Sequence, residues 1–386
     1  MTTTILGIES SCDETAAAVV NDGRTLLSSV VASQISIHRK YGGVVPELAS
    51  REHLRQIVPV VREALLQAEI DFHALDAIGV TQGPGLVGAL LVGITYGKTL
   101  AAALDIPLVP VNHLEGHVHA VFLEAAQAGR VPRLPAVCLI VSGGHTVIYE
   151  VSEQSVAETA GEGAPPGLAV PHEHGLFAYR KLGGTRDDAA GEAYDKVAKL
   201  LALGYPGGPI LDRLAAQARV APPIKFSPTK MKGNAFDFSF SGLKTAVLYH
   251  LREHPEYNEE IHLRNSALER GERSYEQLLA LCSPQTLALI HEFQDAVVRD
   301  LLERTMAAAE SVSAESVLVS GGVAANSALR LAFEERGQRA GIETFFPSRA
   351  LSTDNAAMIA AAAYPRFRAG IFGDGRLNAD PSLALA

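Results

Sequence analysis

The sequence has little cysteine and no excess of positive charge. Its three cysteines are widely spaced and form no Cys-x-x-Cys pair, which excludes a disulfide framework and favours reduced thiols in a cytoplasmic protein. The formal net charge is −10 at pH 7, which argues against a chain that coats nucleic acid through a broad basic surface. Only local basic spots, such as the run at 38–40, remain for such contacts.

Targeting and membrane segments are also missing from the pattern. No basic region precedes an apolar core at the start of the sequence, so we expect no signal or transit peptide. The longest apolar stretch, near 86–104, is interrupted by Gly93, Gly97 and Lys98, and we therefore expect no membrane span. With 47% apolar and 20% charged residues, a chain of 386 residues is long enough for two domains with separate cores.

Strand and helix patterns alternate in the first third of the chain. Apolar runs at 4–9 and 16–20, joined by an acidic polar turn, predict two buried strands. A helical pattern at 47–68 and apolar runs at 77–81 and 108–111 follow. This order predicts an α/β lobe.

A similar order begins again in the middle of the chain. Apolar runs at 136–142 and 147–151 flank a Ser-Gly-Gly turn, and the theme returns at 317–322. Two strand-turn-strand openings about half a chain apart predict a duplicated α/β architecture, with two lobes that face each other across a ligand-binding cleft.

The boundaries follow from this duplication. We expect a first lobe, a second lobe and two insertions in the second lobe, at 1–134, 135–354, about 152–175 and about 253–283. The insertions read as a surface loop and a solvated helical hairpin. We expect the segment at about 355–386 to pack back on the first lobe and to end, from 377 on, in a loose tail.

Two histidines four residues apart suggest a metal site. His113 and His117 would project from one face of a helix, and Asn112 before them is a good helix cap. Two imidazoles and a carboxylate can hold one metal ion, and Asp354 is the best third ligand. A zincin protease needs glutamate directly after the first histidine, where this chain has Leu114.

Glycine pairs follow two of the apolar strands. Ser142-Gly-Gly144 and Ser320-Gly-Gly322 let backbone N–H groups approach a phosphate or ribose, and Asn326 opens a helix after the second turn. Glycine pairs are common as bare turns, but two in matching positions favour a nucleotide cradle. No Walker loop or Rossmann fingerprint is present, so an actin-like nucleotide cleft is the better physical match.

Two further acidic residues lie near a tight glycine turn. Asp195 and Asp212 flank the turn that contains Gly208, and carboxylates accept hydrogen bonds from ribose hydroxyls. Helix capping and surface charge explain them equally well at this point.

Taken together, seven motifs in register resemble the TsaD family of tRNA N6-adenosine threonylcarbamoyltransferases. The match runs from about residue 5 to residue 364. Its motifs are Ile8-Glu-Ser-Ser-Cys-Asp-Glu-Thr15, His113-Leu-Glu-Gly-His117, Val141-Ser-Gly-Gly-His-Thr146, Gly191-Glu-Ala-Tyr-Asp-Lys196, Phe240-Ser-Gly-Leu-Lys244, Ser320-Gly-Gly-Val-Ala-Ala-Asn326 and Ser352-Thr-Asp-Asn355. The resemblance implies an actin-like (ASKHA) two-lobed fold. It also implies transfer of threonylcarbamoyl from its adenylate to the adenosine 3′ of the anticodon in ANN-decoding tRNAs, with release of AMP.

The resemblance also implies roles for individual residues. His113, His117 and Asp354 match the ligands of one divalent metal ion, most often iron, with zinc and magnesium as alternatives. Asp13 and Glu14 match the acidic first turn, where we expect them to support the site and where either is a candidate proton acceptor. The adenylate-holding positions match Ile140, Val141, Ser142, Gly143, Gly144, Asp195, Gly208, Asp212 and Asn326.

The chemistry implied is metal-assisted acyl transfer. The metal would polarise the carbamoyl carbonyl while the protein positions two nucleotides, because an exocyclic purine amine is a poor nucleophile. The partners implied are tRNA, threonylcarbamoyl-AMP, a shorter actin-like paralogue on the N-terminal lobe and a small ATPase, with no membrane.

Three other interpretations compete with this one. An actin-like kinase or ATPase would share the cleft but would not need the histidine pair. A non-catalytic scaffold homologue should lack the His/His/Asp set and the Ser-Gly-Gly turns, all of which are present. A metalloprotease is disfavoured by Leu114.

Overall fold

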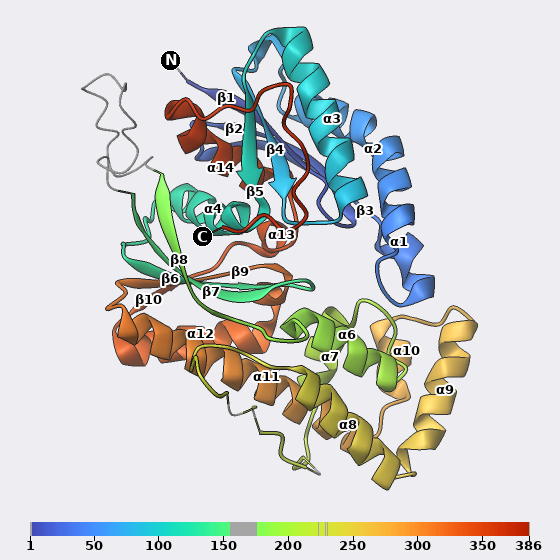
Figure 1. Cartoon of the computed structure of the whole chain (residues 1–386). Helices are drawn as coiled ribbons and strands as arrows, with labels where there is room; N and C mark the ends of the chain where they lie inside the picture. The colour runs from blue at the N-terminus through green and yellow to red at the C-terminus, as the bar shows by residue number, and fades with distance from the viewer. Residues whose placement is uncertain (1, 155–175, 223, 228, 230, 386) are drawn as a thin grey trace.

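The computed structural model of the chain describes residues 2–154, 176–222, 224–227, 229 and 231–385. Within these residues the chain forms two lobes, each built on a five-stranded sheet with helices on both faces (Figure 1). The strand orders are β3-β2-β1-β4-β5 and β10-β9-β6-β7-β8. When the strands of each lobe are numbered in chain order and the second sheet is read from β8, both sheets have the spatial order third-second-first-fourth-fifth. This shared order confirms the predicted duplication.

The N-terminal sheet combines an antiparallel and a parallel part. β1 pairs antiparallel with β2, and β2 with β3, while β1, β4 and β5 run parallel. The strands are β1 (Thr4–Glu9), β2 (Glu14–Asn21), β3 (Thr25–Ser33), β4 (Ala77–Gly83) and β5 (Leu108–Asn112). The central strands are apolar along almost their whole length because helices cover both faces of the sheet.

The C-terminal sheet repeats this arrangement. β6 pairs antiparallel with β7, and β7 with β8, while β6, β9 and β10 run parallel. The strands are β6 (Ala136–Val141), β7 (Thr146–Glu153), β8 (Phe177–Gly184), β9 (Ser316–Ser320) and β10 (Glu343–Phe345). The expected surface loop at about 152–175 lies almost wholly outside the described residues.

Helices of the first lobe sandwich its sheet. α2 and α3 pack on one face, and α4 and α14 pack on the other. The helical elements are α1 (Ile35–His38), η1 (Arg39–Tyr41), α2 (Pro46–Gln67), η2 (Phe72–Ala74), α3 (Val87–Leu104), α4 (His113–Gln127) and α14 (Ala356–Arg368). α14 is rich in alanine, and Gly7 of β1 lies against it so closely that a Cβ there would be 2.2 Å from the carbonyl oxygen of Ala356.

Helices of the second lobe pack mainly on one face of its sheet, where they form a large apolar core with β6 and β9. They are α6 (Ala190–Leu200), α7 (Gly207–Ala215), α8 (Ser241–Glu253), α9 (Tyr257–Glu269), α10 (Tyr275–Ala280), α11 (Pro284–Ser311), η3 (Gly322–Ala325), α12 (Ser327–Ala340) and α13 (Arg349–Ser352). Pro284 and the Ser283 cap begin the long α11.

The segment at 253–283 is a helical hairpin, as expected, but it is not simply solvated. Arg264 on α9 is fully buried and donates hydrogen bonds to the carbonyl oxygens of Leu201 and Leu281. Its partner Glu260 also accepts from the backbone N–H of Ser283. Nε and Nη1 of this buried guanidinium are paired with carbonyl oxygens at the ends of α6 and α10 and with Glu260, which offsets part of the cost of burying the charge. A polar sequence pattern does not reveal this feature.

α4 lies between the two sheets (Figure 1). Ala120 and Leu123 pack into the core of the first lobe, whereas Leu114, Val118 and Val121 pack against β6, β7 and β9 of the second. α4 is therefore buried on most sides, and its first turn opens where the two lobes meet.

One described helix, α3, is long and apolar enough to span a membrane by length and composition alone. Its inner residues Leu90 and Ile94 pack in the core that α3 shares with β4 and α2. Gly97 fits against Val80 of β4, where a Cβ would come within 2.4 Å. The glycines that interrupt the apolar run are thus contact points of a packed helix.

The end of the chain is not a loose tail, contrary to our expectation. The backbone N–H of Asp380 donates to the carbonyl oxygen of Gln82, and the N–H of Gly85 donates to that of Pro381. Residues 369–385 run back along the first lobe to α4 (Figure 1). The sequence predicted a loose tail because the contacts that hold this segment are made by backbone groups. Backbone groups are the same at every position, so the sequence pattern does not reveal such contacts.

Candidate metal centre and nucleotide cleft

The two histidines occupy the first turns of α4. Asn112 ends β5, and its Oδ1 accepts the backbone N–H of Leu114 at 2.9 Å, which begins the helix at His113. His113 and His117 then lie one turn apart, with ring centroids 4.8 Å from each other.

Asp354 meets the histidines from a distant part of the chain. It lies between α13 and α14, directly before Asn355, whose side chain caps α14. Its Oδ1 is 3.2 Å from Nε2 of His117 and 3.6 Å from Nε2 of His113. Burial opposes ionisation of Asp354, but His113 and His117 outweigh it and hold its pKa below the ordinary value.

The three side chains have the donor atoms and the burial expected of a metal site. Their ligand atoms all lie within 4.8 Å of one another. Both ring nitrogens of His117 are buried and make no hydrogen bond to the described residues, which is costly unless another partner is present. Two imidazole nitrogens and one carboxylate oxygen suit a divalent transition metal.

Glu9, which sequence reasoning missed as a site residue, supports this centre. It is fully buried at the end of β1 and accepts from Nδ1 of His113 at 3.0 Å and from Oγ1 of Thr81 at 2.8 Å. Burial raises the pKa of Glu9, but the His113 charge outweighs burial and lowers it overall. A carboxylate on Nδ1 leaves Nε2 facing Asp354, the usual arrangement behind a metal-binding histidine. The signal in the sequence was a charged residue at the end of an apolar strand.

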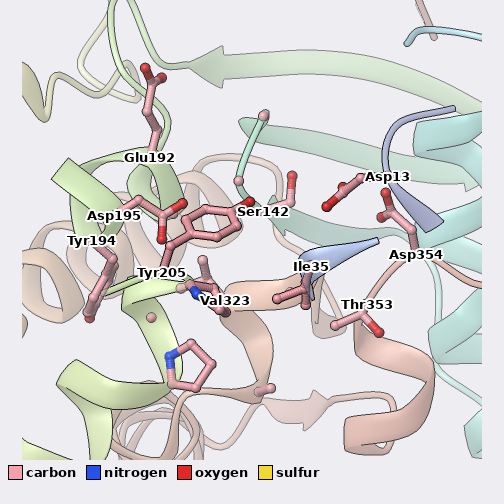
Figure 2. Close-up of a pocket in the computed structure, with 18 of the residues that line it drawn as sticks. Asp13, Ile35, Ser142, Glu192, Tyr194, Asp195, Tyr205, Val323, Thr353 and Asp354 are labelled. Carbon is pink, nitrogen blue, oxygen red and sulfur yellow. The ribbon is translucent and has the colours of Figure 1, made fainter. Parts of the chain in front are cut away.

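A large cavity opens beside the metal centre. It has a volume of about 1300 Å³ and is lined by both lobes. Figure 2 shows Ser142 between Asp13 and Asp354 on one side and Asp195 and Tyr205 on the other. The predicted site residues that line it are Asp13, Glu14, His113, Ser142, Gly143, Gly144, Asp195, Gly208, Asp212, Asn326 and Asp354.

Three predicted positions are not among the residues that line the cavity. His117 is fully buried in α4, one turn after His113. Ile140 and Val141 are fully buried in β6, with their side chains in the cores on opposite faces of the C-terminal sheet. Their packing in β6 fixes the position of the turn at 142–144 that follows them.

The glycines in and around the two Ser-Gly-Gly turns differ in how much room they leave for a side chain. Gly321 has a φ of +93°, and a Cβ there would lie 2.4 Å from the carbonyl oxygen of Val141. A Cβ on Gly191 would lie 2.6 Å from the carbonyl oxygen of Ser142. Gly143 and Gly144 instead face open space. Gly191 and Gly321 therefore pack closely against the backbone around Ser142, whereas Gly143 and Gly144 leave their backbone open to a ligand.

The acidic first turn lies at the same cavity. Burial, Asp13 and Asp354 raise the pKa of Glu14 well above its ordinary value, and Glu14 also accepts from Oγ of Ser33 at 3.2 Å. Adjacent carboxylates in a buried site do not ionise together at low cost. Burial and the neighbouring carboxylates thus favour the protonated form of Glu14.

Comparison with known proteins decides the family. A family model described as tRNA N6-adenosine threonylcarbamoyltransferase, TsaD, matches residues 25–166 and 171–361. The chain belongs to the TsaD family. A relative of that name from Koribacter versatilis is 52% identical over 99% of this chain and 98% of its own length. Another, from an Anaeromyxobacter species, is 48% identical over 99% of both chains.

Solved structures confirm the actin-like fold expected of a TsaD protein. A full-length HypF, in a phosphate- and nucleotide-bound form, superposes with a TM-score of 0.53 at 12% identity over 96% of this chain and 56% of that chain. HypF from T. kodakarensis gives a TM-score of 0.51 at 14% identity over 97% of this chain and 48% of that chain. At such identity the likeness concerns the fold alone.

Family membership confirms the predicted activity. The chain is an enzyme that transfers the threonylcarbamoyl group to N6 of adenosine in tRNA, a metal-assisted reaction in the TsaD family. The family implies a divalent metal, and His113, His117 and Asp354 form a group that fits one. Of the interpretations weighed from the sequence, the transferase is the one confirmed.

Three further residues of the TsaD cleft were missed from the sequence. Tyr205, His145 and Thr353 all line the cavity. Burial is the main reason that the pKa of His145 falls to about 4, so its ring is neutral at neutral pH. His145 lies in the quoted Ser-Gly-Gly-His motif, so its position next to the turn was the available signal.

Proposed function

We propose that His113, His117 and Asp354 hold the metal ion and that the cavity beside them holds threonylcarbamoyl-AMP. The observation that carries this is the continuity of one cavity from His113 and Asp354 past Ser142 to Asp195 (Figure 2). We propose iron as the ion, since two nitrogens and one oxygen suit iron or zinc better than magnesium, which prefers oxygen ligands. When bound, the metal supplies Lewis-acid polarisation of the carbamoyl carbonyl.

The residues of the chain then orient the two nucleotides. We infer that the backbone N–H groups of Gly143, Gly144 and Gly322, which line the cavity, bind the phosphate of the donor. We propose a carboxylate oxygen of Asp13, which lines the cavity, as the acceptor of the proton from the attacking N6 amine. Asp13→Asn with unchanged turnover would remove that role.

Asp195 is the better candidate of the two carboxylates for the ribose. Asp212 uses both oxygens within the protein, accepting from Oγ and the backbone N–H of Ser327. Asp195 accepts only the backbone N–H of Gly207, at 2.6 Å, among the described residues. Its second oxygen is therefore free to accept a ribose hydroxyl.

Adenosine binding should weaken below about pH 6. Burial raises the pKa of Asp195 to about 6, and protonation turns one of its two oxygens from a charged acceptor into an O–H donor. We expect adenosine affinity to be constant above pH 7 and about tenfold lower at pH 5, where roughly a tenth of the group is ionised. Calorimetric titration with adenosine from pH 5 to 8 measures this.

Matched variants test the assignment to Asp195. Asp195→Asn should bind adenosine weakly with no pH dependence in this range. Glu192→Gln changes a neighbouring carboxylate that also lines the cavity and should keep a pH-dependent profile, with its midpoint at a slightly lower pH because the charge of Glu192 contributes to the raised pKa of Asp195. A wild-type profile in Asp195→Asn would refute the ribose contact.

We propose that tRNA contacts the rim of the cavity at η1. Nζ of Lys40 lies over the exposed ring of Tyr41, and the neighbouring Arg39 donates to the carbonyl oxygen of Tyr205. A Cβ on Gly42 would lie 3.8 Å from Nζ of Lys199 on α6. No carboxylate among the described residues pairs with these three cations, although the chain as a whole is acidic. Unpaired cations around an exposed aromatic ring suit phosphates and an unstacked base of an RNA loop.

Reversing two of these charges should weaken tRNA binding without affecting the donor. In Lys40→Glu/Lys199→Glu we expect at least a tenfold higher KM for tRNA and a salt dependence of binding reduced by about one to two phosphate contacts. Arg336→Glu on α12 is the control, since it also replaces an exposed arginine by an acid but lies far from the cavity. Equal tRNA affinity in all three proteins would exclude this surface.

We propose that a shorter actin-like paralogue binds the outer face of α2 and α3. Leu54 and Val58 on α2, and Val87 and Leu91 on α3, are exposed and form two i,i+4 pairs on neighbouring helices. Exposed apolar residues gathered on one face are typical of a protein interface. A small ATPase completes the complex in our proposal, and we propose the cytoplasm as its location, in keeping with three free cysteines.

A negative charge on the outer face of α2 and α3 should disrupt the complex with the paralogue. Leu54 is 67% exposed, so Leu54→Glu should fold normally but bind the paralogue at least a hundredfold more weakly. Leu331→Glu on α12, where the leucine is 57% exposed, is the matched control. Size-exclusion chromatography with light scattering measures the complex, and undiminished binding by Leu54→Glu would place the interface elsewhere.

A further inference from the structure

The last residues of the chain form a hydrogen-bonded strap across the first lobe. The N–H of Gly373 donates to the carbonyl oxygen of Leu108 at 2.8 Å, and Nζ of Lys98 donates to the carbonyl oxygens of Gly375 and Leu377. Gly83 leaves room for this strap, since a Cβ there would lie 1.8 Å from the carbonyl oxygen of Asp380. The strap thus follows the ends of β4 and β5 toward α4.

The strap ends on Asn112, the residue that begins α4. Nδ2 of Asn112 donates to the carbonyl oxygens of Leu383, at 3.3 Å, and Ala384, at 3.1 Å. Oδ1 of the same amide accepts the N–H of Leu114 at 2.9 Å. Both polar atoms of this buried amide are therefore hydrogen-bonded: Nδ2 to the strap and Oδ1 to the helix that begins with His113.

The side chains of the strap also reach the metal-binding helix. Leu385 packs on the apolar cluster that contains Leu114 and Val118 of α4. Those two residues neighbour His113 and His117 along the helix. The strap therefore contacts the first turns of α4 through backbone carbonyls and through an apolar side chain.

We infer that residues 380–385 are a positioning element of the metal centre, acting through Asn112. Two strap carbonyls hold Nδ2, so the amide cannot flip and present a donor to the N–H of Leu114. The cap in turn holds the first turn of α4, from which His113 and His117 project. Asn112 is a positioning residue, since its side chain bonds to the strap carbonyls and to the N–H of Leu114 and acts through the helix that this N–H begins. This inference rests on the proposed ligand roles of the two histidines.

Asn112→Asp separates this role from simple helix capping. Aspartate caps helices as well as asparagine does, so a residue needed only as a cap would tolerate the change. Aspartate cannot donate to Leu383 and Ala384, and its second oxygen would face their carbonyl oxygens. We expect Asn112→Asp to bind Co²⁺ at least tenfold more weakly than wild type, measured by chelator competition and by the cobalt absorption spectrum.

Hydrogen exchange tests the strap in the metal-free protein. The amides of residues 114–117 should exchange at least tenfold faster in Asn112→Asp and in a chain that ends at Asp380 than in wild type. Ser382→Ala should behave as wild type, because the exposed Ser382 side chain bonds, within the described part of the chain, only to Asp380. Thermal unfolding of each variant verifies that it folds.

The outcomes separate the strap from the metal assignment. Wild-type exchange and Co²⁺ affinity in Asn112→Asp would overturn the inference, whatever the shortened chain does. If His113→Ala binds Co²⁺ as wild type does, the ligand assignment fails, while the exchange of the metal-free proteins still decides whether the strap holds α4.

Discussion

His113→Ala should lose tight metal binding and lower the rate of threonylcarbamoyl transfer about a thousandfold. The change removes one of three protein ligands and leaves Asp354 with a single imidazole at 3.2 Å. A thousandfold loss corresponds to about 4 kcal/mol of transition-state stabilisation, which is within the range of a Lewis-acid contribution. Metal content and the formation of threonylcarbamoyladenosine in unmodified tRNA, with threonylcarbamoyl-AMP and partner proteins added, are the measurements.

His73→Ala is the matched control for this prediction. His73 lies exposed on η2, away from the cavity, and its loss should change neither metal content nor rate. A folded His113→Ala protein that keeps its metal and its turnover would show that the imidazole is not a ligand. The effect of Glu9→Gln on metal binding should lie between those of His113→Ala and His73→Ala, with about a 10–100-fold loss of metal affinity. The substitution keeps the size of the side chain behind His113 but removes its charge.

Gly7→Ala should destabilise the first lobe by about 3 kcal/mol or more. The added methyl would lie 2.2 Å from the carbonyl oxygen of Ala356 and 2.7 Å from the backbone nitrogen of Ala360. Both atoms belong to the backbone of α14, so relief requires β1 and α14 to separate, and overpacking of this kind is costly. Urea unfolding of the two proteins measures the difference.

The same substitution should also weaken metal binding. Asp354 lies two residues before α14, so a shifted helix moves that carboxylate relative to His113 and His117, and metal affinity should fall together with stability. Gly375→Ala is the control, because nothing lies within 4 Å of a Cβ at that position. An unfolding midpoint for Gly7→Ala equal to that of the control would contradict the close packing of α14 on β1.

Local patterns predicted much of the fold. The apolar runs at 4–9 and 136–142 became β1 and β6, and the repeated order of strands became two sheets of the same topology. The pattern did not predict β3, β8 or β10. β10 has three residues and is strand only because it pairs with β9. The pattern also could not show that Arg264 is buried, because its partners are backbone carbonyls distant in sequence.

Much of the site was also predictable, but not the way its parts are connected. The spacing of His113 and His117 and the cap at Asn112 are properties of one helix, so the sequence alone determined them. Glu9, Asp354 and the strap at 380–385 come from distant segments, and only the tertiary structure decided that they meet this helix. Tertiary hydrogen bonding likewise decided that Asp195, and not Asp212, keeps an oxygen for a ligand. The physical reason is that periodicity and capping act between residues a few positions apart, whereas these contacts depend on how two sheets pack around α4.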